Sequence, residues 1–298
     1  MYSLIASPKK YSGNKTTIKR LKKLLKLDIS NELQSYSIGI NAYNFGEQLS
    51  NLEEGKYIED YIVILGGTDI YDHINDPVKK VLMTTTLEKS KWIVSFNMDM
   101  KERLLDKFEI SCDKIRIIPQ SVSTKLKGSK YNLYNALNID TNKKIFVMIG
   151  NVRPIKRVDF LFDHFKKNKK EVLVIIGEMS HQTYVFPNNV YHINGLNKKD
   201  IYASMKQSTG LINCSINEGM SSAILEAMAL RCPVYAFRNP GNMALVRDNF
   251  NGYLFSSKSD FSFIIKLPTK HIIKNAFDYV SVNHSPRNEK NAYLDILS

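Results

Sequence analysis

The sequence predicts an α/β protein made of two parallel β-sheets, each covered by helices on both faces. Short apolar runs recur along the 298-residue chain without polar alternation, as is typical of strands buried on both faces. Amphipathic segments separate these runs, and strand–helix alternation of this kind indicates parallel sheets. A polar stretch at residues 121–143, rich in Ser, Asn and Lys, interrupts the pattern and marks the expected domain boundary.

In chain order, five predicted strands precede the polar stretch and six follow it. The runs are YSLIA (2–6), SIGI (37–40), YIVIL (61–65), WIVSF (92–96), IRIIP (115–119), KIFVMIG (144–150), VLVIIG (172–177), VYHI (190–193), GLINC (210–214), PVYAF (233–237) and GYLF (252–255). The first intervening segment has helical spacing, with Ile18, Leu21 and Leu25 on one face and lysines around the rest. From Asp260 onward the tail is expected to be helical.

Composition and charge narrow the class of protein. Apolar residues make up 43% of the chain, too many for a disordered protein. Lysine and arginine number 42 against 29 aspartate and glutamate, a net charge of +13 that we take as spread along the chain. Such a surplus can attract nucleotides, nucleic acid or an acidic membrane face. The three cysteines are widely spaced and exclude a disulfide framework.

No apolar run has the length of a membrane span or of a signal peptide. We therefore expect a cytoplasmic protein. The lysine-rich helix expected near residues 15–26 leaves weak peripheral contact with an anionic membrane as an alternative.

The segment between GLINC and PVYAF carries the strongest candidate site. Glu218 follows a predicted strand, and Gly219 allows the backbone to approach a ligand closely. Ser221 and Ser222 are N-cap types at the start of a helix that contains Glu226. Free amides at a helix start suit a phosphate, and the two carboxylates can accept hydroxyls from two parts of one ligand. Alternatively, Glu226 complements the helix dipole and Glu218 is an exposed turn residue.

Positive charge and glycine follow two other predicted strands. After Gly150, Arg153 and Lys156 stand in the next loop, where a guanidinium and an ammonium together can neutralise a diphosphate. After the first strand, Gly13 and Asn14 form a turn that opens the lysine-rich helix. That turn is equally an ordinary helix start.

A third strand end carries Gly66-Gly67-Thr68-Asp69, which suits a ligand lying close to the backbone. Asp69 can orient a hydroxyl group of such a ligand. It can equally cap the next turn through an Asx-type hydrogen bond.

Together these segments resemble the retaining glycosyltransferases of family 4, the glycosyl transferases group 1, which have the GT-B fold. That fold has two Rossmann-like domains facing a cleft. The shared signature is Glu-Gly, then Glu-Ala-Met-Ala and Pro-Val, within residues 218–234. Arg-Pro-x-Lys at 153–156, Gly-Asn-x-x-Thr at 13–17 and Gly-Thr-Asp at 67–69 are similar to the subgroup of glycosyltransferase 1 domain-containing proteins.

The resemblance implies roles for these residues. Glu226 would bind the ribose of a nucleotide-sugar donor and Glu218 the hydroxyls of its sugar, while Lys156 and Arg153 would bind the diphosphate leaving group. Further donor contacts would come from Gly219, Met220, Ser221, Ser222, Gly150, Gly13 and Asn14. The resemblance implies no metal and no other cofactor.

The resemblance also implies the domain roles. Residues 1–125 would be the acceptor-side domain, 143–283 the donor-binding domain, and 284–298 a helix that returns to the first domain. The first domain is expected to be reduced, because little separates the helix ending near Leu27 from the next predicted strand.

The expected activity is retaining, hexosyltransferase-like transfer from a nucleoside-diphosphate sugar such as a UDP-sugar. The acceptor, whether small molecule, glycan, lipid or protein, is not indicated, and neither is the oligomeric state. Asn151 stands where the family usually has an arginine after the glycine. This departure and the reduced first domain favour an alternative, a non-catalytic nucleotide-sugar-binding protein or a partner subunit of an active glycosyltransferase. Nucleic-acid binding rests on charge alone, and we expect none.

Overall fold

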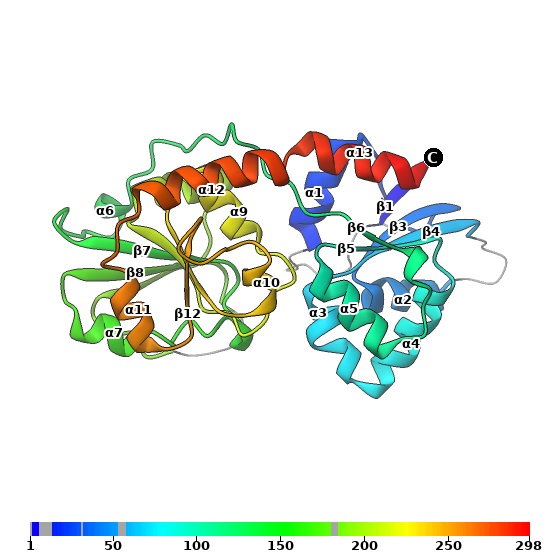
Figure 1. Cartoon of the computed structure of the whole chain (residues 1–298), viewed down its shortest axis with the longest axis horizontal. Helices are drawn as coiled ribbons and strands as arrows, with labels where there is room; N and C mark the ends of the chain where they lie inside the picture. The colour runs from blue at the N-terminus through cyan, green and yellow to red at the C-terminus, as the bar shows by residue number, and fades with distance from the viewer. Residues whose placement is uncertain (1, 6–13, 31, 53–57, 180–183) are drawn as a thin grey trace. The chain divides into compact units, whose positions relative to one another are not determined.

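The computed structural model describes the whole chain except residues 1, 6–13, 31, 53–57 and 180–183 (Figure 1). The chain divides into two compact units, Met1–Gln120 with Pro286–Ser298, and Ser121–Ser285. The sequence analysis ended the first domain at residue 125 and began the second at 143. The structure instead divides at Gln120 and places the polar stretch 121–143 in the second unit.

The first unit contains a six-stranded parallel sheet in the order β2-β1-β3-β4-β5-β6. Its strands are β1 (Ser3–Ile5), β2 (Ile29–Ser30), β3 (Tyr36–Ile40), β4 (Asp60–Ile64), β5 (Trp92–Ser95) and β6 (Ile115–Ile117). All five predicted runs form strands. The sequence analysis missed β2, a two-residue edge strand, because so short a segment has no detectable apolar run.

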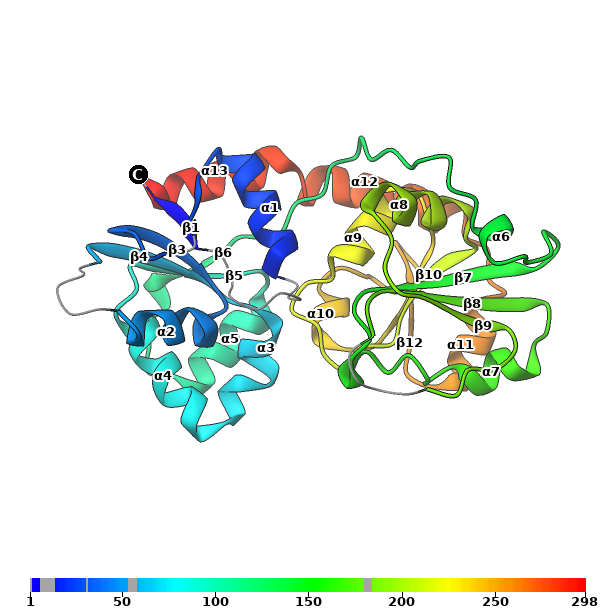
Figure 2. The same cartoon turned by 180° about the vertical axis from the view of Figure 1, so that it is seen from behind.

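Helices cover both faces of this sheet (Figures 1 and 2). They are α1 (Asn14–Leu25) and α13 (Pro286–Leu297) on one face, and α2 (Ala42–Ser50), α3 (Gly67–Tyr71), α4 (Pro77–Glu88) and α5 (Met98–Lys107) on the other. Short 3₁₀ turns lie at His73–Asn75 and Cys112–Lys114.

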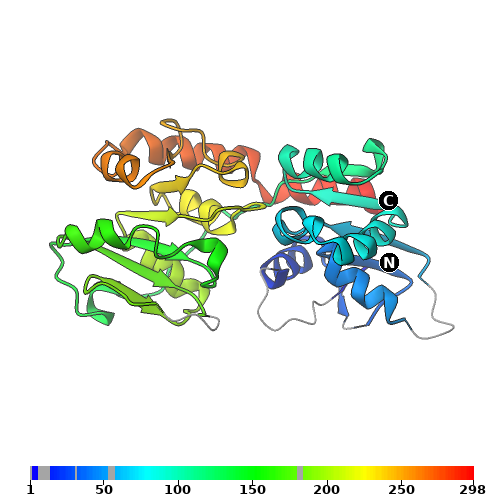
Figure 3. The ribbon, with the colours of Figure 1, turned by 90° about the horizontal axis from the view of Figure 1, so that it is seen from below.

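The last helix of the chain, α13, belongs to the first unit, and Figure 3 shows it in red among the early elements. Arg20 of α1 forms an ion pair with Glu289 of α13, 3.1 Å from its Nε. The same guanidinium donates to Gln120 at the end of the first segment, at 2.9 Å. The returning helix is therefore tied to α1 by a buried charge pair.

The second unit contains a parallel sheet in the order β9-β8-β7-β10-β11-β12. Its strands are β7 (Lys144–Ile149), β8 (Glu171–Ile176), β9 (Val190–Ile193), β10 (Gly210–Asn213), β11 (Val234–Phe237) and β12 (Tyr253–Phe255). All six predicted runs form strands. Strand order reverses between β7 and β10, so ligands are expected outside the carboxyl ends of these two strands.

Helices also cover both faces of the second sheet (Figure 2). They are α8 (Lys198–Gln207), α9 (Ser222–Ala229) and α12 (Lys270–Asn283) on one face, and α7 (Phe162–Lys167) and α11 (Lys258–Ile264) on the other. The connections contain the short helices α6 (Leu133–Ala136) and α10 (Pro240–Met243) and a 3₁₀ turn at Pro154–Lys156. Aromatic rings fill the core beneath α7 and α11, where Phe146, Phe165 and Phe261 pack edge to face.

The tail residues expected to be helical form α11, α12 and α13. Within the described ranges, none of the helices combines the length and hydropathy needed to cross a bilayer.

Candidate active site

The candidate site lies where β7 and β10 end, at the point of strand-order reversal in the second sheet. Leu211 of β10 pairs with Val147 of β7, so the loops that follow the two strands start side by side. One loop carries Lys156, and the other carries Glu218. The topology thus brings together two residues that are 62 positions apart in the chain.

Glu218 is held by three side chains. The Lys156 ammonium forms an ion pair with its Oε1, and the side chains of these two residues are only 22% and 12% exposed. The Ser215 hydroxyl donates to the same oxygen at 2.8 Å and the Asn213 amide at 3.2 Å. Glu218 is therefore a preoriented carboxylate and not an exposed turn residue.

The environment keeps Glu218 ionised. Burial by itself would raise the pKa of this carboxyl, but the Lys156 charge and the hydrogen bonds from Lys156, Ser215 and Asn213 outweigh it, and the pKa is lowered. An ionised carboxylate only accepts hydrogen bonds, so Glu218 can bind sugar hydroxyls and is not a proton donor at neutral pH.

A glycine of helix α10 lets the loop that carries Glu218 pack closely against that helix. A Cβ on Gly241 of α10 would lie 1.8 Å from the carbonyl oxygen of Glu218. Only glycine therefore allows the Glu218 backbone to rest directly on α10.

Helix α9 begins at this loop. Ser221 is its N-cap and accepts from the Ile224 amide at 3.4 Å, as expected from the sequence. Within the described part of the chain, the amides of Ser222 and Ala223 have no hydrogen-bond acceptor. These first-turn amides form a positive helix end that can bind an anion. Gly219 and Met220 lie in the preceding loop and are buried.

Glu226 lies on α9 and is 7% exposed. The Lys198 ammonium contacts its Oε1 at 2.5 Å, and the Tyr202 hydroxyl lies 3.4 Å from the same oxygen. Burial, followed by the charge of Glu226, raises the pKa of Tyr202, which therefore stays a neutral donor. The other oxygen, Oε2, is buried without a hydrogen-bond partner among the described residues. An unpaired buried carboxylate oxygen is costly, and a hydroxyl from a ligand would satisfy it.

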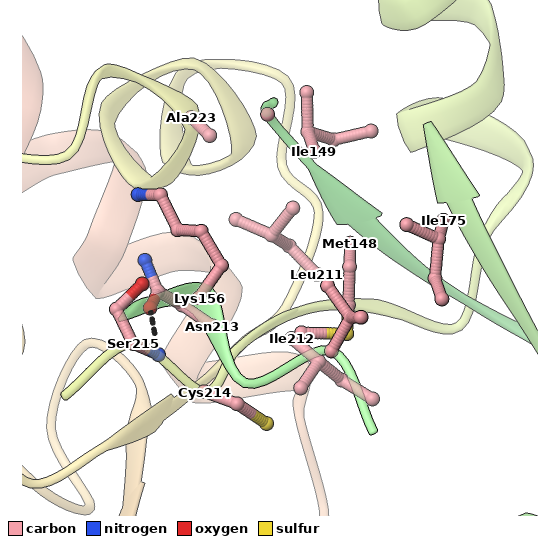
Figure 4. A pocket seen from close by; sticks show the side chains of 12 residues that line it. Met148, Ile149, Lys156, Ile175, Leu211, Ile212, Asn213, Cys214, Ser215 and Ala223 are labelled. Carbon is pink, nitrogen blue, oxygen red and sulfur yellow. Dashed lines mark hydrogen bonds between the residues drawn. The ribbon is translucent and has the colours of Figure 1, made fainter. Parts of the chain in front are cut away.

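A small pocket of about 20 Å³ lies between the ends of β7 and β10, room for roughly one water molecule. Figure 4 shows Lys156, Asn213 and Ser215 on one side of it and apolar strand residues such as Met148 and Ile175 on the other. A nucleotide is far larger than this volume, so the pocket by itself could hold only a small part of such a ligand. Across the described residues, no group of three or more His, Cys, Asp or Glu side chains is placed to hold a metal ion.

The loop after β7 depends on two glycines. Gly150 has φ = 136°, which L-residues rarely adopt, and Gly177 approaches it so closely that a Cβ would lie 2.0 Å from the Gly150 carbonyl oxygen. Arg153 is exposed and forms no ion pair with any residue that the structure describes. Its side chain is therefore free to reach a ligand, while Asn151 is half-buried beside Gly150.

The candidates from the first domain lie in the first unit. Gly13 falls outside the described residues, and Asn14 begins α1 with a side chain that is not described. Asp69 is fully buried. Its Oδ2 accepts from the amides of Ala42 and Gly66, each at 2.8 Å, so this carboxylate joins the starts of α2 and α3. Its Oδ1 accepts the Tyr43 amide at 3.3 Å and lies 3.4 Å from Nδ1 of His73. The geometry is that of a cap, and a ligand at either oxygen would displace a backbone hydrogen bond.

The sequence analysis missed several residues of the site. Asn213 and Ser215 hold Glu218, and their place at the end of a predicted strand was a usable signal. Lys198 lies 28 positions from Glu226, and no spacing rule links them. Arg157, in the left-handed conformation with φ = 43°, stacks on Phe237 at 4.0 Å and donates to the Cys214 carbonyl at 2.9 Å. Arg157 thereby links the loop after β7 to the loop after β10.

Comparison with known proteins identifies the family. The model of the glycosyl transferases group 1 matches residues 130–267. A relative from Xenopus tropicalis, described as glycosyltransferase 1 domain-containing protein 1, is 30% identical over 334 residues, which cover 98% of this chain and 96% of the relative.

Solved structures show the same architecture. Anabaena HepE, determined in complex with UDP and glucose, is similar with a TM-score of 0.80 at 12% identity, covering 99% of this chain and 98% of that one. WaaG, a glycosyltransferase involved in lipopolysaccharide biosynthesis, is similar with a TM-score of 0.77 at 11% identity over 99% of both chains. The chain thus belongs to the glycosyl transferases group 1 and has their GT-B fold of two Rossmann-like units.

Proposed function

We propose that this protein is a retaining glycosyltransferase that uses a UDP-sugar as donor and transfers its sugar to an acceptor still to be identified. The observation that carries the proposal is the Lys156–Glu218 pair at the point of strand-order reversal, eight residues before Glu226 on α9. These three side chains suit the three parts of a nucleotide sugar. Lys156 suits the diphosphate, Glu218 can accept the hydroxyls of the sugar, and buried Glu226 can accept those of the ribose. The UDP complexes of HepE support the choice of uridine as the nucleoside.

In the proposed complex, the Lys156 ammonium leaves Glu218 and forms an ion pair with the diphosphate. Lys156, the exposed Arg153 and the first amides of α9 then offset the charge that develops on the departing diphosphate. Glu218, released from Lys156 but still held by Ser215 and Asn213, accepts hydroxyls of the sugar. Glu226 accepts ribose hydroxyls, which give its buried Oε2 a partner. Within this proposal, side chains and backbone amides provide the positive charge, and Asp69 has no catalytic role.

The experiment that tests the donor site is thermal unfolding with a panel of nucleoside diphosphates and their sugars. A ligand at about 100 times its Kd should stabilise the protein by about 2.7 kcal/mol. We expect such a shift with UDP and UDP-sugars in the wild type and in the matched control Glu178→Ala, and no shift in Glu226→Ala. A folded wild type that responds to none of these ligands would contradict the proposal.

Transfer itself is tested by release of UDP from UDP-sugars, with and without candidate acceptors. Glu218→Gln keeps the size of the side chain but removes its charge, and we expect release to fall about a hundredfold. Donor binding without any release, in both wild type and variant, would instead favour the non-catalytic nucleotide-sugar-binding protein. Nuclear magnetic resonance of the first product would show whether the anomeric configuration is retained.

A further inference from the structure

The positive charge of the chain is concentrated in one unit. Residues 121–285 contain 22 lysines and arginines but only 11 aspartates and glutamates, a net charge of +11. The remaining residues contain 20 basic and 18 acidic side chains, a net charge of +2. The sequence analysis took the charge as spread along the chain, whereas a count over the two units places most of the excess in the second.

Within the second unit, six lysines gather at the amino end of the sheet. We call them the lysine edge, and they are Lys143, Lys144, Lys166, Lys167, Lys169 and Lys170. Lys143 and Lys144 lead into β7, while the other four span the end of α7 and the turn into β8. The Lys144 amide donates to the Lys170 carbonyl at 3.0 Å, so the two segments are in direct contact.

The nearby carboxylates are bound by other partners. The charges of Lys166 and Lys167 act on one of these carboxylates, Asp163, without forming an ion pair with it. Glu171 is engaged by buried His164 at 2.7 Å, and Asp163 by Lys258 at 2.6 Å. The Asp140 carboxylate accepts the Asn142 amide in its own turn. None of the six lysines forms an ion pair with a residue in the described ranges, and all but Lys143 are exposed.

An exposed aromatic side chain lies beside the lysine edge. Helix α11 packs next to α7, as Figures 1 and 2 show, through a 2.8 Å contact between the Ser262 hydroxyl and His164 Nδ1. Phe263, the next residue, is 65% exposed, and exposed Lys266 follows in the turn after the end of α11. A phenylalanine among unpaired lysines is the composition of a surface that inserts into a lipid interface.

We propose that the lysine edge and Phe263 form a docking surface for a membrane rich in anionic phospholipids. The cluster contains lysine and no arginine, and point charges of this kind suit a diffuse anionic surface better than the directed contacts of nucleic-acid recognition. Lys143 precedes β7 and Lys144 is its first residue, whereas Gly150 and Lys156 follow the strand, roughly 17 Å away along it. Docking would therefore leave the donor site open, whatever ligand that site binds.

The test is sedimentation of the full chain with vesicles of equal parts phosphatidylglycerol and phosphatidylcholine, against vesicles of phosphatidylcholine alone. Lys166→Gln, Lys169→Gln and Lys170→Gln are combined in one variant. The matched control combines Lys19→Gln, Lys22→Gln and Lys23→Gln on α1, the other lysine-rich helix. A third variant is Phe263→Ser. Thermal unfolding without ligand verifies that each variant is folded, so the outcome does not depend on nucleotide binding.

We expect wild type to bind the anionic vesicles only, with weaker binding at high salt. Each lysine contributes about fivefold near an anionic surface, so the triple variant should lose about a hundredfold in partition. The α1 control should stay within about twofold, and Phe263→Ser should lose about tenfold. No binding by wild type, an equal loss in the α1 control, or binding to single-stranded polynucleotide in place of vesicles would overturn the proposal. An unchanged partition of Phe263→Ser would overturn the aromatic anchor.

Discussion

Replacing Lys156 by methionine is the sharpest test of the candidate site, because it removes one charge and keeps most of the side-chain volume. In the unliganded protein the change leaves Glu218 with two donors, Ser215 and Asn213. Breaking a fully buried ion pair costs about 3–5 kcal/mol. Here the two side chains are 22% and 12% exposed and two hydrogen bonds persist, so we expect a loss of about 1–2 kcal/mol in the free energy of unfolding.

Turnover should respond far more strongly than stability. If Lys156 stabilises the departing diphosphate, its loss should lower kcat by about a hundredfold to a thousandfold at saturating donor. The assay is release of UDP from a UDP-sugar, measured beside urea unfolding of the same sample. Lys206→Met on α8 is the matched control, because its side chain is exposed and forms no ion pair with the described residues. Wild-type turnover in a folded Lys156→Met variant would refute the reasoning.

The stability loss should also depend on pH. The pKa of Glu218 is lowered in the folded protein, so its stabilising effect is present above the ordinary carboxyl pKa and is lost as the pH falls through the lowered value. Lys156→Met removes the main cause of that lowering, and burial then raises the pKa. The difference in unfolding free energy between wild type and variant should therefore be largest near neutral pH and shrink in acid. A difference that is constant with pH would show that the pair has no electrostatic coupling.

Three further outcomes follow from the geometry. Asp69→Asn should lower stability by about 2 kcal/mol in urea unfolding, because a carboxylate oxygen that accepts two backbone amides is replaced, while the shift induced by UDP stays as in wild type. Gly241→Ala should raise the KM for donor about tenfold, because its Cβ would displace the Glu218 backbone. Turnover after treatment with EDTA should stay within about twofold of the untreated enzyme, and an activity restored only by a divalent cation would contradict the proposed role of Lys156 and Arg153.

Much of the fold could be predicted because parallel strands buried on both faces leave continuous apolar runs. Eleven strands were identified in this way, and β2 was missed since Ile29–Ser30 is a two-residue edge strand. The sequence also indicated where the candidate site lies, and the strand order places the loops after β7 and β10 together. Contacts such as Lys198–Glu226 were not accessible, since they depend on how α8 packs beside α9 and leave no periodic signal.

Local sequence could not distinguish the two carboxylates that follow glycine-rich or polar strand ends, but their hydrogen-bond partners in the structure differ. Asp69 accepts backbone amides, which are fixed by the fold, so a ligand could take its oxygens only by unravelling the starts of two helices. Glu218 accepts from Lys156, Ser215 and Asn213, whose side chains can turn to a ligand without any change in the backbone. In the sequence, both carboxylates stand in segments with turn residues, so the sequence alone does not separate them. A carboxylate stabilises the fold when its hydrogen-bond donors are fixed backbone amides, and it can bind a ligand when its donors are side chains that can move. Only the tertiary structure shows which donors are present.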